Sequence, residues 1–266
     1  MTKLCIFCSS RANSDEHAWP NWLLKILKRH PEDSTTIETM HDHQLPRQWG
    51  GVDAAIKLKC VCEKTCNNGW MHKLEDRTKP ILSPMIKDNP MKLTGVQQRT
   101  IVEWIVKTAM VFDIAKPDKY IFYDKVERSS FREHLIPPSN NAIWIARYSG
   151  SALGDAATSS RTSFAGIRKE GPRLIKYHVH TMCFGRLALQ IFSWKPLVHE
   201  PPLLVEINAV YGQWRDAALP IWPVNVLPID WPPKLSLSDG ESSLEAFANR
   251  FNGMINIGMP FRGIRP

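Results

Sequence analysis

Two stretches of sequence decide how this chain folds near its amino terminus: Cys5-Ile6-Phe7-Cys8 with Ser14-Asp15-Glu16-His17-Ala18-Trp19-Pro20, and later Cys62-Glu63-Lys64-Thr65-Cys66-Asn67-Asn68-Gly69-Trp70. Two residues separate Cys5 from Cys8, and three separate Cys62 from Cys66. Gaps of this length let two thiolates reach one tetrahedral zinc ion. We therefore expect these four cysteines to form one structural zinc site.

The residues next to the two cysteine pairs carry chemistry of a different kind. Glu16 and His17 follow the first pair, and Asn67 directly follows the second. Binding of one zinc ion by both pairs would bring these three side chains close together in space. Neutral imidazole, with an unperturbed pKa of ~6.5, can accept a proton from water at neutral pH. A histidine in this position is therefore a candidate general base.

In this order, the two cysteine pairs, the Glu-His-x-x-Pro segment and the Cys-Asn pair resemble the zinc-bearing HNH nucleases, over residues 5 to about 77. The resemblance implies a ββα-metal finger, in which a β-hairpin presents the acid and the histidine and a helix presents the last ligand. It also implies that His17 is the general base. Glu16 and Asn67 would hold a catalytic divalent ion, and their oxygen ligands suit Mg²⁺ or Mn²⁺.

The chain departs from this family pattern between the two motifs. Fifty positions separate the histidine from the helix asparagine, so residues 21–52 are expected to form an insertion. The second cysteine pair has one extra residue, and Cys60 is an alternative to Cys62 as a zinc ligand. We prefer Cys62, because Cys60-x-Cys62 would be a tight pairing. The family's middle asparagine has no counterpart in residues 54–59, and Glu16 replaces the commoner aspartate.

Composition places the chain among globular proteins with a polyanionic partner. Its 266 residues and 43% hydrophobic content suffice for one large domain or two modest ones. A formal charge of +8 and a pI of about 9.2 suit nucleic acid, since basic side chains that meet phosphates release counterions. No apolar run long enough to span a membrane is present, and grouped cysteines are typical of metal sites in reducing compartments. We expect a cytoplasmic protein without a membrane partner.

Hydrophobic periodicity predicts helices and one strand in the first half of the chain. Residues 19–28 predict a short amphipathic helix, whose other face carries Lys25, Lys28 and Arg29; this face is either a phosphate contact or an ordinary solvated surface. Alternation over residues 54–61 predicts the second strand of the finger. A helix is expected to open at Cys66 and to end near Pro80 and Pro84, with His72 as a further candidate contact to nucleic acid. The spacing over residues 94–115 predicts a long helix that is largely buried on one side.

Beyond residue 120 the pattern changes to the period of two that is typical of strands. Strands are predicted at residues 142–147, 161–166, 174–181, 187–192 and 203–207, giving an antiparallel sheet or open barrel. His178 and His180 share one face of their strand; such a pair can bind a metal but is more often solvated. Residues 220–233 are rich in proline and are expected to lie extended across the surface. Residues 242–245 have capping-box spacing and predict a final helix.

These patterns together predict an α+β protein with an HNH finger at residues 1–90, a connecting helix at 91–118 and a mainly antiparallel β domain at 119–266. The resemblance implies a metal-dependent endonuclease that hydrolyses DNA, with RNA as an alternative substrate, of a kind found in phages and in bacterial defence. The β domain would bind the target, a second copy of the chain or a partner protein. The alternative is a zinc-stabilised module that binds nucleic acid or protein and has lost catalysis, which the departures described above favour.

Overall fold

A computed structural model describes residues 3–17, 19–27, 37–41, 47–48, 57–116, 118–150, 156–168, 172–196, 214, 216–223, 227–237 and 241–251. Its helical elements are α1 (Asn21–Ile26), α2 (Lys64–Cys66), η1 (Asn67–Met71), α3 (His72–Ile86), α4 (Gly95–Asp113), η2 (Asp118–Tyr120), α5 (Lys125–His134) and α6 (Glu241–Asn249). Its strands are β1 (Ser14–His17), β2 (Ile37–His41), β3 (Arg47–Gln48), β4 (Lys57–Cys62), β5 (Met91–Leu93), β6 (Asn141–Arg147), β7 (Ala156–Arg168), β8 (Pro172–Phe184), β9 (Leu187–Pro196), β10 (Ala218–Trp222) and β11 (Ile229–Trp231). The protein is α+β, as the sequence predicts.

The amino-terminal part is a two-stranded sheet followed directly by a helix. β1 pairs antiparallel with β4, with Ser14 opposite Cys62 and Glu16 opposite Leu58, and a bulge lies between these two pairs. After Cys62 the chain turns into α2, η1 and α3, which run on as one helical rod interrupted only by the non-helical backbone of Gly69. The extra residues of the bulge belong to β4, so the bulge brings the second cysteine pair next to the start of β1.

The prediction that Pro80 and Pro84 end this helix is wrong, because α3 contains both prolines and continues to Ile86. An interior proline costs roughly 3 kcal/mol, since it lacks the N–H that would bond the carbonyl four residues earlier. The helix persists because one side of it is buried against α4. That side consists of Leu74, Thr78, Ile81, Leu82, Met85 and Ile86.

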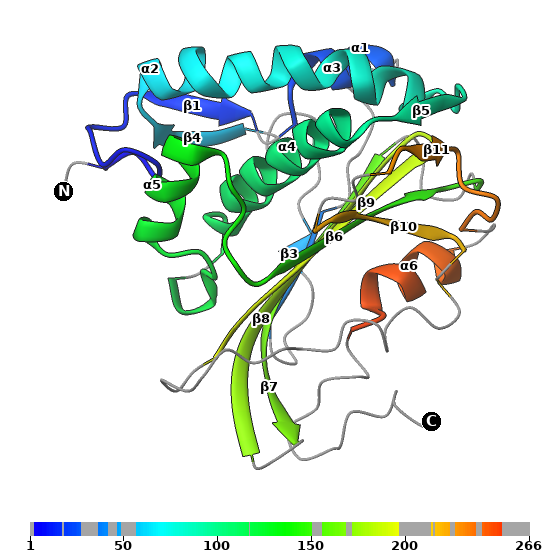
Figure 1. The fold of residues 1–266 in the computed structure, drawn as a ribbon. Coiled ribbons are helices and arrows are strands. Elements are labelled where there is room, and N and C mark those ends of the chain that lie inside the picture. The colour runs from blue at the N-terminus through cyan, green and yellow to red at the C-terminus, as the bar shows by residue number, and fades with distance from the viewer. Residues whose placement is uncertain are drawn as a thin grey trace.

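Within the described residues, the main sheet has seven strands in the order β10-β6-β9-β8-β7-β2-β3. All neighbouring strands are antiparallel except β2 and β7, which are parallel. α4 crosses one face of the sheet beneath α3, and α6 lies on the opposite face (Figure 1). β2 and β3 come from the predicted insertion at residues 21–52, so this segment extends the main sheet rather than the amino-terminal one.

Two hydrophobic clusters fill the spaces on the two faces of the sheet. In β6, Ile143 and Ile145 belong to the cluster around α4, whereas Trp144 belongs to the cluster around α6. Alternation of side chains along a strand produces this division, and it explains why the strands are apolar on both faces. α4 itself is buried all round over most of its length, with Thr94 providing a capping box at its start. The long helix predicted at residues 94–115 is therefore a central element of the core.

The strand predictions agree with β6, β7, β8 and β9, while the predicted strand at residues 203–207 lies outside the described part of the chain. The predicted extended segment at residues 220–233 contributes strands to two sheets. β10 forms an edge of the main sheet, and β11 pairs with β5 in a small separate sheet. The final helix, α6, is described from Glu241, so the predicted capping residue at position 242 lies inside the helix.

A polar network lies buried where the end of α4 meets the main sheet. Lys116 Nζ donates to Asp113 Oδ1 at 3.0 Å and to Thr162 Oγ1 at 2.9 Å, and it lies 2.9 Å from His178 Nδ1. The His180 ring contacts Phe112 in a tilted arrangement, with 4.9 Å between the ring centroids. Both histidines are fully buried, so the common solvated arrangement does not apply to this pair.

This network predicts that the fold loses stability in mild acid. Burial lowers the pKa of His178 and of His180 well below the usual value; the Lys116 ammonium lowers the pKa of His178 further, and His178 does the same to His180. The unfolded chain takes up protons at these histidines below pH ~6.5, whereas the folded chain does not. Stability is therefore fully present above that pH and falls by about 1.4 kcal/mol per histidine for each pH unit below it.

Urea denaturation at pH 7.5, 6.5 and 5.5 measures this effect. We expect His180→Gln to remove about half of the loss between pH 6.5 and 5.5, since one of two titrating groups is gone. His134→Gln is the matched control, because His134 is an exposed residue at the end of α5. Equal pH dependence in the unmodified chain and in His180→Gln would show that His180 is protonated in the folded state.

Candidate metal centre

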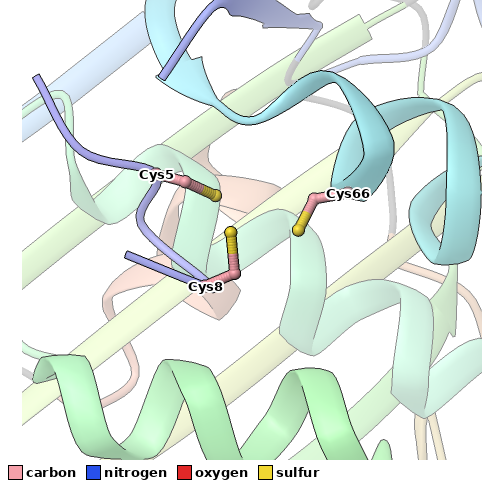
Figure 2. Close-up of side chains that lie close together, drawn as sticks. All are labelled: Cys5, Cys8 and Cys66. Carbon is pink, nitrogen blue, oxygen red and sulfur yellow. The ribbon is translucent and has the colours of Figure 1, made fainter. Parts of the chain in front are cut away.

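Three cysteines from two distant parts of the chain converge on one point. The Sγ atoms of Cys5, Cys8 and Cys66 all lie within 4.8 Å of one another. Cys5 and Cys8 come from the loop before β1, Cys66 comes from the end of α2, and the three sulfur atoms point toward one another (Figure 2). Soft thiolate ligands suit zinc. The cluster can therefore hold a metal ion and is compatible with structural zinc.

Local hydrogen bonds set the two halves of this cluster. In the loop, the Cys5 N–H donates to Ser10 O at 2.7 Å and the Phe7 N–H donates to Cys5 Sγ at 3.4 Å. On the helix side, the Glu63 carboxylate caps α2 by accepting from the Cys66 N–H at 3.1 Å. Asn13 joins the halves, since its Oδ1 accepts the Lys64 N–H at 2.7 Å. These hydrogen bonds hold the loop and the start of the helix in the arrangement in which the three sulfur atoms converge.

Cys62, the fourth predicted zinc ligand, is not among the three cysteines whose sulfur atoms converge. It is fully buried, and its thiol forms a hydrogen bond with Cys5, which lowers the pKa of Cys5 to about 4 and raises that of Cys62. Burial and the neighbouring Cys8 raise the pKa of Cys66 to about 12. A bound zinc ion would have to displace the thiol protons of Cys62 and Cys66. The Cys60 side chain lies outside the described part, so the preference for Cys62 stays a prediction.

Asn67 connects the start of the helical rod with β1. Its Nδ2 donates to Asp15 O at 2.7 Å and lies 3.4 Å from Ser14 Oγ. Only the NH₂ group of an amide can bond a carbonyl oxygen, so this contact also fixes which way the amide points. The Oδ1 atom is left as an oxygen that can serve as a ligand. The structure therefore brings Asn67 onto the strand that carries Glu16 and His17.

Glu16 lies beneath the surface of this site and is paired with a lysine that sequence reasoning missed. Lys107 Nζ, in the middle of α4, is 3.1 Å from Glu16 Oε1 and 3.0 Å from Glu75 Oε1. Burial raises the pKa of Glu16; Lys107 opposes this shift and Glu75 adds to it. The signal was a single lysine within the largely apolar residues 104–112, a position that a solvated helix face does not explain.

The other predicted site residues lie on or near the surface. His17 is half-buried at the end of β1, where it pairs with Lys57. Lys25 is exposed on α1, whereas Lys28 and Arg29 lie outside the described residues. His72 is exposed at the start of α3, and its Nε2 lies 3.5 Å from Asp76 Oδ2. These positions do not test the predicted contacts of these residues with nucleic acid, which stay predictions.

Comparison of the chain with protein-family models, with curated proteins and with solved structures gives no match. The helices of the described part include none with the length and apolar character needed to cross a membrane. The assignment of a function therefore rests on the chemistry of the residues around β1, α3 and α4.

Proposed function

We propose that this chain is an HNH-type endonuclease that hydrolyses phosphodiester bonds of DNA. The observation that carries the proposal is the contact of Asn67 with β1, because it joins the helix asparagine to the strand of Glu16 and His17 across 52 sequence positions. The sequence order of strand, strand and helix around a thiol cluster also suits a ββα-metal finger. In this proposal zinc is structural and is held by Cys5, Cys8, Cys66 and Cys62.

His17 is the proposed general base. His17 directly follows the buried Glu16 in β1, and its half-buried side chain is accessible to a water molecule while its backbone is held in the strand. A positioned base of this kind accepts the proton of the water that attacks the phosphorus atom. The hydrolysis forms a bond between the water oxygen and phosphorus and breaks the bond to the leaving 3′-oxygen, which gives 5′-phosphate and 3′-hydroxyl ends.

Glu16 and Asn67 are the proposed ligands of a catalytic Mg²⁺ or Mn²⁺ ion. The donor set fits such an ion, since Asn67 Oδ1 and the Glu16 carboxylate supply oxygen atoms. When bound, the ion would offset the negative charge that develops on a phosphate oxygen. Lys25 and His72 are exposed near this part of the chain and are proposed to meet the DNA backbone. RNA remains the alternative substrate, because contacts to the backbone carry little sequence information.

One observation favours the second candidate function, a zinc-stabilised binding module without catalysis. The carboxylate of Glu16 already has a cationic partner, Lys107, within the core. If this pair is a purely structural replacement for the metal ion, the chain would bind nucleic acid or protein without cleaving it. A role in phage or bacterial defence belongs to the first candidate, through the family resemblance, and the cytoplasmic location is proposed from the grouped cysteines.

A plasmid-nicking assay separates the two candidates. We expect the purified zinc-loaded chain to convert supercoiled plasmid to the open-circular form with Mg²⁺ or Mn²⁺ and to leave it intact in excess chelator. The second measurement is a gel shift with the same DNA in the chelator. If the chain shifts the DNA in the gel but nicks no plasmid with either Mg²⁺ or Mn²⁺, the binding module replaces the nuclease as the proposed function.

A further inference from the structure

Lys107 is a buried cation that three separate elements share. Its ammonium lies 3.1 Å from Glu16 on β1 and 3.0 Å from Glu75 on α3, while Lys107 itself belongs to α4. The side chain of Lys107 is 0% exposed, compared with 4% for Glu16 and 18% for Glu75. The lysine therefore connects the core of the protein to the strand that carries the proposed general base.

Fold stability alone does not account for a lysine at this position. The residues around it on α4 include the buried apolar Trp104, Val106 and Val111, together with the buried Glu103 and Thr108. Replacing a buried ion pair by apolar side chains of similar volume is often neutral or stabilising, because the charges no longer need to leave water. Apolar residues in place of Lys107, Glu16 and Glu75 together would suit the core, whereas an apolar residue at position 107 alone would leave two carboxylates without a cation. The presence of the ammonium therefore depends on Glu16 and Glu75.

The position of Glu16 indicates why its carboxylate is paired with the Lys107 ammonium. Glu16 directly precedes His17, and Asn67 binds the same strand at Asp15 O. A carboxylate that binds a metal ion commonly also accepts a hydrogen bond from a neighbouring donor, and this bond fixes the orientation of the carboxylate. Lys107 is such a donor for Glu16 and approaches it from the core.

We propose that Lys107 is a positioning residue of the catalytic site, where its hydrogen bond fixes the Glu16 carboxylate, and that Glu75 holds Lys107 in place by accepting a second hydrogen bond. This inference rests on the proposed function, since it assigns Glu16 to the binding of the divalent ion. It adds two residues, from α3 and α4, to a site that the sequence motif confines to β1 and the start of the helical rod.

Titration of the zinc-loaded full-length chain with Mn²⁺, followed by the loss of the free-ion electron paramagnetic resonance signal, tests the proposal. We expect Lys107→Met to weaken Mn²⁺ binding by about 10- to 100-fold, the range found when the residue behind a metal ligand is removed. Lys195→Met is the matched control, because Lys195 also pairs with two carboxylates, those of Asp124 and Glu127, in another part of the fold. The control should leave Mn²⁺ affinity unchanged.

The outcomes separate this inference from the proposed function. Mn²⁺ binding by Lys107→Met that is as tight as, or tighter than, that of the unmodified chain would overturn the positioning role and leave the nuclease proposal standing. If the unmodified chain binds no Mn²⁺, the metal-dependent function fails and the inference fails with it. Should Lys107→Met not fold, Glu75→Gln decides by the same measurement: weaker binding supports the role of the network, and unchanged binding overturns it.

Discussion

His17→Ala is expected to abolish plasmid nicking, with a fall in rate of about 10²- to 10⁴-fold, the usual contribution of a general base. The methyl group of alanine cannot accept the proton of the attacking water. The substitution removes a half-buried side chain at the end of a strand, and the thiol cluster lies elsewhere on the chain. Zinc content and the circular dichroism spectrum should therefore remain those of the unmodified protein.

His134→Ala is the control for this substitution. His134 is an exposed histidine at the end of α5 and lies outside the region formed by β1, η1 and α3. It should nick plasmid at the rate of the unmodified chain. Full activity of His17→Ala, in a preparation freed of contaminating nuclease, would remove His17 from the mechanism and direct attention to another base.

Loss of the structural metal is expected to have the largest effect on stability. Cys66→Ser removes the thiolate that joins α2 to the loop of Cys5 and Cys8, so zinc content should fall from about one ion per chain toward zero. The melting temperature should fall by about 10 °C or more, since ~1 kcal/mol corresponds to about 2–4 °C in a domain of this size and structural zinc contributes several kcal/mol.

Cys183→Ala is the matched control for the metal prediction. Cys183 is also buried, but it lies in β8 and packs in the cluster on the α6 side of the sheet. We expect this variant to keep its zinc, although the lost packing lowers its stability modestly. Differential scanning fluorimetry and atomic absorption on both variants check the prediction. An unchanged metal content in Cys66→Ser would show that the cluster binds no zinc through α2.

Local features of the sequence were sufficient for the cysteine pairs, the long helix and most of the strands. The spacing of Cys5 and Cys8 matches the reach of two side chains to one ion. The periodicity of residues 94–115 predicted the helix itself, although α4 is buried all round over most of its length and not on one side only. Each of these signals lies within a few consecutive residues. The amino-acid sequence could therefore predict the α+β class and the converging thiols without knowledge of distant neighbours.

The prolines of α3 and the histidines of β8 show where local reasoning failed. Pro80 lowers helix propensity at its own position, but burial of one side of α3 against α4 outweighs that cost. His178 lies on a strand in a pattern that also suits a solvated face, and it is buried because Lys116, Phe122 and Tyr123 cover it. In both cases, packing against residues from another part of the chain decides the local structure or the burial.

By itself the sequence determined the elements and the ligand types, since propensity, periodicity and side-chain chemistry are properties of neighbouring residues. The tertiary structure alone decided the partner of Glu16, because Lys107 lies 91 positions away and meets it only when α4 packs beneath β1 and α3. It also decided that β2 and β3 join the main sheet. Charge pairing and strand pairing between distant segments depend on the packing of the whole chain.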